Sequence, residues 1–239
     1  MKVKFVGVGT VTDARPQSCI LVENEDIHIL VDIGCGSMVN LQKIIDINKI
    51  DAILITHHHL DHNGDLLNFL KTRYLLKGKK VLISGPKGTY NFMKCILNCY
   101  PYLLNKVKYE IIEETEFSIG KLEIKPIRTI HSIRSVAYMI TNGNKSIIIS
   151  GDTIPLKYLL KIECDLLIHE MSLPFGAKTS DHTTPETFAE ILKYCKSKTI
   201  YLTHMYPQTE AISDKIIRYL SKFYSGKIEV AREFNTIYI

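Results

Sequence analysis

A short segment of the chain concentrates side chains that bind metal ions. Residues 57–62 read His-His-His-Leu-Asp-His and so place imidazole and carboxylate groups close together. Such ligands suit borderline divalent ions, Zn²⁺ above all and also Mn²⁺ or Fe²⁺. A single histidine is more often an ordinary core or surface residue, but a cluster this dense exceeds the needs of one tetrahedral site. The candidate ligands in the segment are His57, His59, Asp61 and His62.

Further candidate ligands follow strand-like apolar runs elsewhere in the chain. His131, Asp152 and His204 each stand within a few residues of the end of such a run, as does the 57–62 segment. Loops beyond strand ends can converge at one edge of a sheet, where α/β proteins usually place their sites. We therefore group these distant residues with the first segment. The four runs are 52–55, 122–127, 146–149 and 199–202.

The elements that must position these residues include many predicted strands. Runs rich in Ile and Val, several of them apolar at consecutive positions, indicate strands that are buried on both faces. Burial on both faces requires helices or a second sheet against each side. The predicted strands are 3–8, 27–31, 52–55, 81–83, 122–127, 146–149, 166–168 and 199–202.

Stretches with helical spacing lie between these strands. One of them begins with Thr183 and Glu186 at the separation of a capping box. No linker, low-complexity tract or repeat interrupts the pattern, so the sequence predicts a layered α/β protein with a single domain over residues 1–239. The predicted helices are 38–45, 65–76, 90–98, 155–160, 185–196 and 214–223.

The composition sets limits on the class of protein. A hydrophobic fraction of 46% supports a sizeable core, and a net charge of +5 is only mildly basic. The one tight basic cluster, Lys77, Lys79 and Lys80, is interpreted as a solvated turn and not as a nucleic-acid surface. The cysteines are scattered, which indicates buried free thiols. No run reaches membrane-spanning length and the amino terminus is unlike a signal peptide, so we expect a cytoplasmic protein with no membrane partner.

The pattern His-x-His-x-Asp-His at 57–62 resembles the signature of the metallo-β-lactamase superfamily. The resemblance covers nearly the whole chain and implies a four-layer αβ/βα sandwich, in which two sheets face each other and two divalent metal ions lie at one edge. Zn²⁺ is the expected metal, with Mn²⁺ and Fe²⁺ as alternatives. The implied ligands are His57, His59 and His131 for one ion, Asp61, His62 and His204 for the other, and Asp152 as a bridge, whereas His58 is not a ligand.

Further segments are similar to ribonuclease Z, the branch that removes 3′ trailers from precursor tRNA. The similarity implies that Glu170 and His182 assist proton transfer, that Asp61 belongs to the catalytic set and that a hydroxide bridging the metals is the nucleophile. The segments are Gly85-Pro86-Lys87-Gly88, Ser150-Gly151-Asp152-Thr153, His169-Glu170, Asp181-His182-Thr183-Thr184 and Leu202-Thr203-His204.

The stretch between Gly85 and His131 departs from that branch. It has room for a helix and two or three strands, but not for the long arm by which typical ribonucleases Z grip tRNA. We expect a phosphodiesterase of ribonuclease Z type that acts on precursor tRNA, with small or cyclic-nucleotide phosphodiesters as the close alternative. Thioester or lactam hydrolysis ranks lower, and a non-enzymatic scaffold lower still because no ligand position is missing. A homodimer is common in the resembled branch.

Two polar residues near the candidate ligands keep two interpretations each. Asp65 either caps the helix that starts near Gly64 or orients a ligand imidazole. Tyr206 either lines the site, where an aromatic ring can stack on a base, or packs in a turn. The sequence does not choose between these roles.

Overall fold

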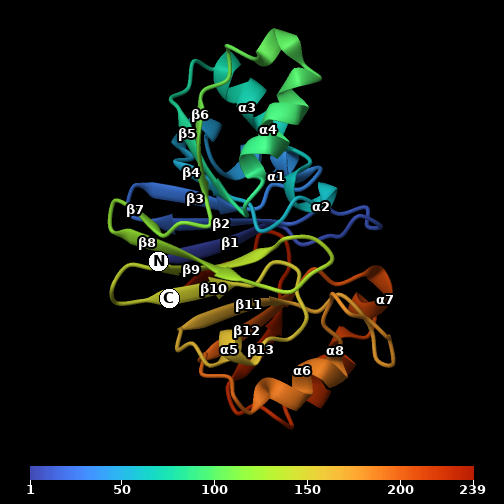
Figure 1. Ribbon diagram of the computed structural model, residues 1–239. Helices are drawn as coiled ribbons and strands as arrows, with labels where there is room; N and C mark the ends of the chain where they lie inside the picture. The colour runs from blue at the N-terminus through green and yellow to red at the C-terminus, as the bar shows by residue number, and fades with distance from the viewer.

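The computed structural model describes residues 1–239 and contains two seven-stranded sheets that face each other (Figure 1). The first sheet has the strand order β14-β1-β2-β3-β4-β5-β6. Its strands from β3 to β6 run parallel, whereas the pairs β14-β1, β1-β2 and β2-β3 are antiparallel. These strands are β1 (Lys2–Gly7), β2 (Cys19–Asn24), β3 (Ile27–Val31), β4 (Ala52–Leu54), β5 (Val81–Gly85), β6 (Tyr109–Glu113) and β14 (Thr236–Tyr238).

The second sheet has the order β13-β12-β11-β10-β9-β8-β7. Its strands from β10 to β13 run parallel, and β7, β8, β9 and β10 form an antiparallel meander. These strands are β7 (Phe117–Ile119), β8 (Leu122–Arg128), β9 (Val136–Thr141), β10 (Ser146–Ile149), β11 (Leu166–Glu170), β12 (Thr199–Thr203) and β13 (Lys227–Val230).

Helices cover the outer face of each sheet, which gives the predicted four layers (Figure 1). Helices α1, α3 and α4 pack on the first sheet, and α5, α6 and α8 pack on the second. None of the helices combines the length and the apolar character that crossing a membrane requires. The helices are α1 (Ser37–Ile44), α2 (Leu60–Asn63), α3 (Leu66–Leu75), α4 (Thr89–Asn98), α5 (Lys157–Leu160), α6 (Pro185–Leu192), α7 (Pro207–Glu210) and α8 (Ser213–Leu220), with 3₁₀ turns η1 (Ile47–Lys49) and η2 (Pro101–Leu103).

Alternating side chains divide the apolar residues among three cores. In β4, Ala52 and Leu54 belong to the core between the sheets, while Ile53 belongs to the core beneath α1, α3 and α4. In β10, Ile147 likewise faces the other sheet and Ile148 faces the helices. Successive residues of a strand point to opposite faces, so the consecutive apolar positions are explained by burial of both.

All eight predicted strands and all six predicted helices are present, and the predicted fold is confirmed. Six further strands were not predicted, because several are short or lie near a sheet edge and alternate with polar residues. All six cysteines are free, but Cys35, Cys95 and Cys99 are exposed, so the expectation of buried thiols is wrong for these three. The six further strands are β2, β6, β7, β9, β13 and β14.

The capping box of α6 lies one residue later than predicted. Thr184 is the N-cap, and its hydroxyl accepts a hydrogen bond from Thr187 N at 3.3 Å. Pro185 occupies the first helical position, where its fixed φ suits a helix and its missing N–H is not needed. The predicted partner Glu186 instead accepts from Gly176 N at 2.9 Å.

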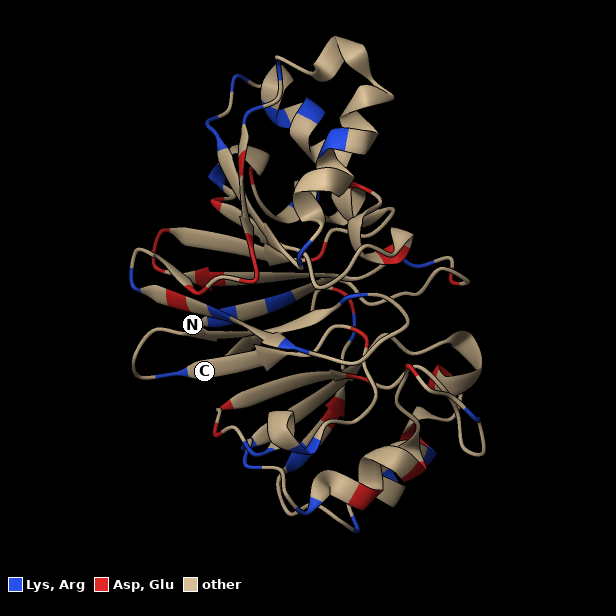
Figure 2. Cartoon of the chain, in the orientation of Figure 1, with Lys and Arg blue, Asp and Glu red and all other residues tan.

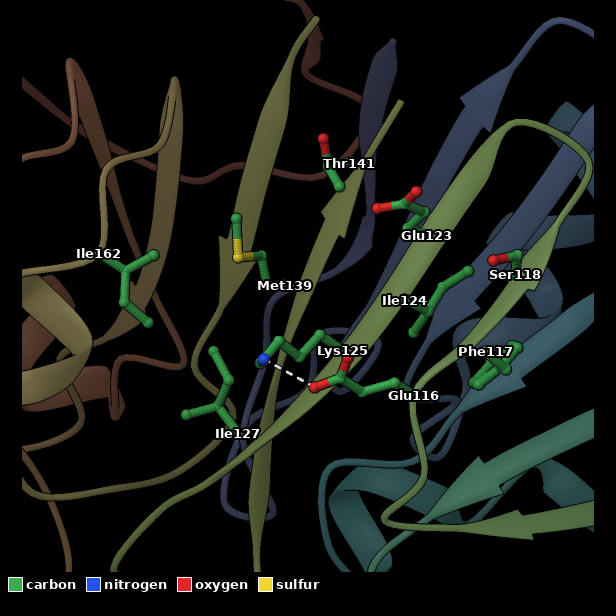
Figure 3. Close-up of a pocket in the computed structure, with 10 residues that line it drawn as sticks. All are labelled: Glu116, Phe117, Ser118, Glu123, Ile124, Lys125, Ile127, Met139, Thr141 and Ile162. Atoms are coloured by element: carbon green, nitrogen blue, oxygen red, sulfur yellow. Dashed lines mark ion pairs between the residues drawn. The ribbon is translucent and has the colours of Figure 1, made fainter. Parts of the chain in front are cut away.

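A pocket of about 690 Å³ lies on β7, β8 and β9, near the edge of the second sheet (Figure 3). Its apolar wall includes Phe117, Ile127 and Met139, and an ion pair of 2.7 Å joins Lys125 to Glu116 beside it. No candidate metal ligand lines this pocket. The cavity is therefore separate from the site predicted from the sequence.

Candidate metal centre

Loops from both sheets bring the predicted ligands to one edge of the sandwich. His57 and His59 follow β4 of the first sheet, whereas His131 and Asp152 follow β8 and β10 of the second. The ligand atoms of these four residues, which we call the first cluster, all lie within 4.8 Å of one another. His59 Nδ1 is 3.1 Å from His57 Nε2 and 3.2 Å from His131 Nε2.

Asp61, His62 and His204 form a second cluster, whose ligand atoms again lie within 4.8 Å of one another. His204 Nε2 is 3.2 Å from both His62 Nε2 and Asp61 Oδ2. Asp152 of the first cluster also lies close to the second. Its Oδ2 atom is 3.8 Å from His57 Nε2, and its Oδ1 atom is 3.3 Å from His62 Nε2. One carboxylate therefore presents one oxygen to each cluster.

Hydrogen bonds hold the ring nitrogens that face away from the clusters. When the outer nitrogen of an imidazole carries the proton and donates it outward, the inner nitrogen presents a lone pair to the cluster. The pairs are His62 Nδ1 with Asp32 Oδ2 at 2.7 Å, His57 Nδ1 with Thr56 Oγ1 at 3.1 Å, His131 Nδ1 with the Asp181 carbonyl at 2.8 Å, and His204 Nδ1 with Ser172 Oγ at 3.1 Å.

The donor atoms of the clusters fit cations better than they fit one another. Imidazole nitrogens of the clusters face each other at 3.1 to 3.2 Å. Asp152 Oδ1 is buried and accepts no hydrogen bond. Leaving such an atom unpaired costs about 1–3 kcal/mol or more for a charged group, and a cation among the donors removes that cost. Histidine and carboxylate ligands in this number are typical of zinc sites.

The electrostatics of the clusters also favour bound cations. Burial raises the pKa of Asp152, but His204 and His62 hold it well below its usual range. Burial lowers the pKa of His62, yet the carboxylates of Asp152 and Asp32 raise it well above its usual value. These carboxylates favour a metal cation there as they favour a proton. Burial keeps the pKa of His57 well below its usual value, so this imidazole is neutral, as a ligand must be.

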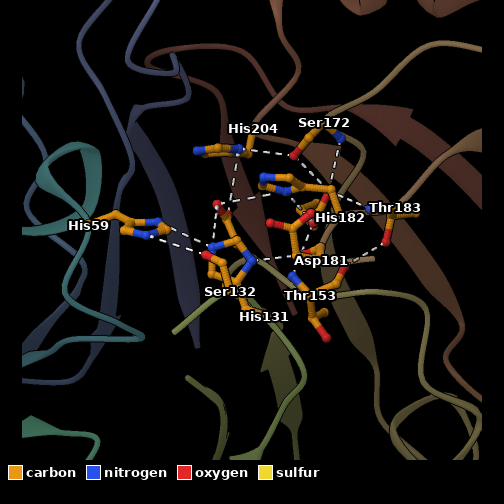
Figure 4. A network of polar contacts seen from close by, with 12 residues as sticks. His59, His131, Ser132, Thr153, Ser172, Asp181, His182, Thr183 and His204 are labelled. Carbon is orange, nitrogen blue, oxygen red and sulfur yellow. Dashed lines mark hydrogen bonds and ion pairs between the residues drawn. The ribbon is translucent and has the colours of Figure 1, made fainter. Parts of the chain in front are cut away.

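The predicted proton-transfer pair lies beside the clusters, and Figure 4 shows His182 next to His131 and His204. His182 Nδ1 donates to Glu170 Oε1 at 3.0 Å and lies 4.0 Å from Asp152 Oδ2. Burial lowers the pKa of His182, but the Glu170 carboxylate more than offsets this and raises the pKa to about 9. Glu170 is buried, and its carboxylate is fully engaged. Its other donors are Thr153 N at 3.0 Å, Ser172 Oγ at 2.7 Å, Ser172 N at 2.9 Å and Thr183 N at 3.2 Å.

His58 and Asp65 support the loop instead of joining the clusters. His58 Nε2 contacts Thr89 Oγ1 at 2.8 Å, and its ring stacks on Phe92 with 4.2 Å between centroids. Asp65 stands at the N-cap of α3 but makes no capping bond there. Its carboxylate instead accepts from Met38 N of α1 at 2.9 Å, so both predicted roles are wrong. The first turn of α1 has no side-chain cap of its own, and Asp65 supplies the missing acceptor.

Three functional positions were not predicted from the sequence. Asp32, Thr56 and Ser172 hold ligand imidazoles, although none of them is a predicted ligand. Each follows the end of a strand, so the rule that found the ligands could also have found them. The ring of Tyr206 lies edge-on to His182 and His204 at 6.4 and 6.3 Å between centroids. Tyr206 therefore lines the site, which decides between its two interpretations.

A two-sheet αβ/βα sandwich with histidine and aspartate clusters of this kind at one edge defines a class of metal-dependent hydrolases. The sequence profile of the metallo-β-lactamase superfamily matches residues 12–204, and the chain belongs to this superfamily. The family, the fold and the hydrolase class predicted from the sequence are thereby confirmed.

The chain is also similar to individual sequence relatives and solved structures. The ribonuclease Z of Nitrosopumilus maritimus (strain SCM1) is 28% identical, over 85% of this chain and 89% of the relative. The crystal structure of the short form of human tRNase Z has a TM-score of 0.81 and 25% identity, over 100% of this chain and 99% of that one. YhfI from Bacillus subtilis, a metallo-β-lactamase fold protein, has a TM-score of 0.83 at 20% identity, over 99% and 98% of the two chains, and shows the shared fold.

Proposed function

We propose that the chain is a phosphodiesterase of ribonuclease Z type that removes 3′ trailers from precursor tRNA. The observation that carries the proposal is the His182–Glu170 hydrogen bond of 3.0 Å beside the bridging Asp152. Cleavage of a phosphodiester expels an alkoxide, which needs a proton donor, whereas the thiolate expelled from a thioester needs none. The relatives named ribonuclease Z support the same substrate class.

The proposal includes two divalent cations, with Zn²⁺ as the first choice. When bound, such cations polarise a phosphoryl oxygen, lower the pKa of water and stabilise the leaving oxygen. Histidine and carboxylate ligands accept Mn²⁺ or Fe²⁺ as well, so metal supply contributes to the choice. We assign His57, His59 and His131 to one ion, Asp61, His62 and His204 to the other, and Asp152 to both.

Side chains of the protein orient the site and transfer the proton. Glu170 holds His182 at Nδ1, and His182 Nε2 makes no hydrogen bond within the protein, so it is the atom that donates to the leaving oxygen. Ser172 Oγ contacts both Glu170 Oε2 at 2.7 Å and His204 Nδ1 at 3.1 Å, which couples the proton donor to a ligand. Burial raises the pKa of Asp61, but His204 lowers it to about 2, so Asp61 serves as an ionised acceptor.

Hydrolysis of small or cyclic phosphodiesters is the second candidate. The chain between β5 and β8 contains α4, η2, β6 and β7 with their connections, and no additional arm. A long RNA therefore lacks the grip that the arm supplies in typical members of the branch. A small diester needs only the clusters and the His182–Glu170 pair.

Cleavage of a precursor tRNA with a 3′ trailer tests the two candidates. The metal-loaded wild-type chain should cut directly after the discriminator base, and the Asp152→Ala variant should not. Intact RNA together with hydrolysis of cyclic nucleotides by the wild type would replace the first candidate by the second. Equal cleavage by both proteins would refute the assignment of Asp152. A homodimer and a cytoplasmic location stay predictions, which light scattering and cell fractionation can check.

A further inference from the structure

Positive charge is concentrated in one part of the chain. Residues 66–108 contain nine Lys and Arg and no Asp or Glu. Of the 30 Lys and Arg in the chain, 21 therefore remain for the other residues, against all 25 Asp and Glu. Figure 2 shows Lys and Arg, without Asp or Glu, on α3 and α4. The modest net charge of the whole molecule conceals this asymmetry.

Most of these cations have no carboxylate partner. Arg73 is buried and donates to the carbonyls of Ile47 and Ile50, so it serves the fold. Lys80 pairs with Glu110 at 2.6 Å. Outside the segment, four of the 13 exposed lysines stand within 4.0 Å of a carboxylate: Lys121, Lys125, Lys198 and Lys227. Seven exposed lysines of the 66–108 segment have none: Lys71, Lys77, Lys79, Lys87, Lys94, Lys106 and Lys108.

Exposed tyrosines accompany these lysines. Tyr102 is 51% exposed, and Lys71 Nζ lies 5.6 Å from its ring centroid. Tyr74 is 40% exposed, and Lys106 Nζ lies 5.8 Å from its centroid. A tyrosine ring offers a face for stacking, and an adjacent ammonium group offers a contact for phosphate. Single-stranded nucleic acids are bound by this combination.

These side chains line two depressions that follow one another along α3. The first, about 360 Å³, is lined by residues that include Leu60, Lys71, Phe92, Tyr100 and Tyr102, and we call it the tyrosine pocket. The second, about 410 Å³, follows the far end of α3 and we call it the lysine groove. Its lining includes Tyr74, Lys77, Lys79, Lys106 and Lys108.

The tyrosine pocket begins at the metal-binding loop. Leu60 is 70% exposed and stands in the chain between the predicted ligands His59 and Asp61. Phe92 stacks on the ring of His58, which belongs to the same loop. From there α3, about 15 Å long, leads away to the lysine groove. A strand held in both depressions would thus run from the clusters across the outside of the first sheet.

We propose that the tyrosine pocket and the lysine groove bind a single-stranded segment of the RNA substrate as it leaves the metal centre. The inference rests on the proposed function and names the surface that takes the place of the missing arm. Bases stack on Tyr102 and Tyr74, and the phosphates between them contact Lys71 and Lys106. A second copy of the chain fits poorly, because a symmetric contact would bring the same unpaired lysines together.

RNA binding tests the inference separately from cleavage. The probe is fluorescein-labelled oligoadenylate, and anisotropy is measured over a series of salt concentrations in the full-length Asp152→Ala background. Adding Lys71→Gln and Lys106→Gln should reduce the slope of log affinity against log salt by about 1.4, since each neutralised phosphate contributes about 0.7. Adding Tyr102→Leu instead should weaken binding about tenfold, because leucine offers no aromatic face for stacking. If Asp152→Ala unfolds the chain, wild type with phosphorothioate oligoadenylate takes its place.

A matched pair of substitutions controls for the change in net charge. Lys121→Gln with Lys227→Gln removes two exposed lysines that pair with Glu25 and Glu229, and should leave the salt slope unchanged. Equal slopes of log affinity against log salt in the two double variants would overturn the inference. A Tyr102→Leu substitution that changes dimerisation and leaves RNA binding unchanged would also overturn it. Precursor cleavage by the wild type together with equal slopes would overturn the inference and keep the proposed function. The predicted slopes without any cleavage of precursor tRNA would keep the inference of RNA binding and overturn the proposed function.

Discussion

At the scale of single residues, the orientation of four candidate ligand imidazoles depends on neighbours that are not themselves candidate ligands. The 2.7 Å contact between His62 Nδ1 and Asp32 Oδ2 fixes which ring nitrogen faces the second cluster. Asp32 also accepts from Thr56 N at 2.8 Å, and Thr56 in turn contacts His57. One carboxylate on the loop after β3 therefore orients ligands of both clusters. Such outer partners typically tune metal affinity.

Asp32→Asn should weaken zinc binding by about 10- to 100-fold, as is usual when an outer partner of a ligand is replaced. The amide can donate to His62 Nδ1, which moves the ring proton to the nitrogen that faces the cluster. Competition with a chromophoric chelator measures the affinity. Asp51→Asn is the matched control, because Asp51 accepts from His28 N at 2.9 Å away from the clusters. An unchanged affinity in Asp32→Asn would show that Asp32 is a passive neighbour.

His182→Gln should lower kcat on precursor tRNA by about 100- to 10,000-fold, the usual contribution of a general acid. Bound zinc should stay the same, because Glu170 already engages His182 Nδ1. Steady-state kinetics and metal analysis of the same sample separate the two effects. His182 also lies near His131 and Asp181, in a group that could hold an ion. Parallel loss of zinc and activity would make His182 a ligand and remove it from proton transfer.

At the scale of elements, buried polar contacts fix the helices against the sheets that carry the ligand loops. Arg73, in the last turn of α3, donates at 2.7 Å to the carbonyls of both Ile47 and Ile50. It also donates to the Lys79 carbonyl, at 2.9 Å, just before β5. Arg73 also lines the lysine groove, so the same guanidinium secures the end of α3 that borders this groove.

Arg73→Met should reduce the free energy of unfolding by about 2–4 kcal/mol, because it leaves buried carbonyls without a donor. Urea denaturation gives the change from the midpoint and slope. Lys222→Met, at an exposed position after α8, should stay within about 0.5 kcal/mol of the wild type. A small effect of Arg73→Met would mean that water replaces the guanidinium.

At the scale of the whole molecule, the metal centre joins the two sheets. His57 and His62 follow β4 of the first sheet, His62 within α2, and Asp152 and His204 follow strands of the second sheet. The apolar core between the sheets holds the same two layers together, with Phe5 and Tyr138 fully buried. A cation held by both clusters would link layers that separate on unfolding, and so would stabilise the native state.

Removal of metal should therefore lower the melting temperature. Saturation at a thousandfold excess over Kd contributes about 4 kcal/mol. Each kcal/mol shifts the melting temperature by about 2–4 °C in domains of this size. Calorimetry with zinc and then with EDTA measures the shift, and Asp152→Ala should show a much smaller one. A wild-type melting temperature that EDTA leaves unchanged would argue against metal binding by the clusters.

The sequence alone determined the kind of site and the kind of fold. Ligand chemistry belongs to the side chain, so the dense run from His57 to His62 indicated a candidate metal site before any geometry was known. The position of His131, Asp152 and His204 after apolar runs indicated that they converge, because strand ends meet at a sheet edge. Consecutive apolar residues in β4 and β10 indicated strands covered on both faces, which is the sandwich that the structure shows.

Only the tertiary structure decided which side chains form hydrogen bonds with one another. The partners Asp32 and His62 are 30 positions apart, Ser172 and His204 are 32 apart, and Asp65 serves α1 instead of its own helix. Such contacts depend on strand order and loop path, which no local pattern encodes. Lys77 and Lys79 likewise were interpreted from the sequence only as part of a solvated turn, because the distance from a lysine to a carboxylate depends on the fold and not on spacing along the chain. The chemistry of a side chain follows from its residue type, whereas its hydrogen-bond partners and neighbouring charges follow from the fold.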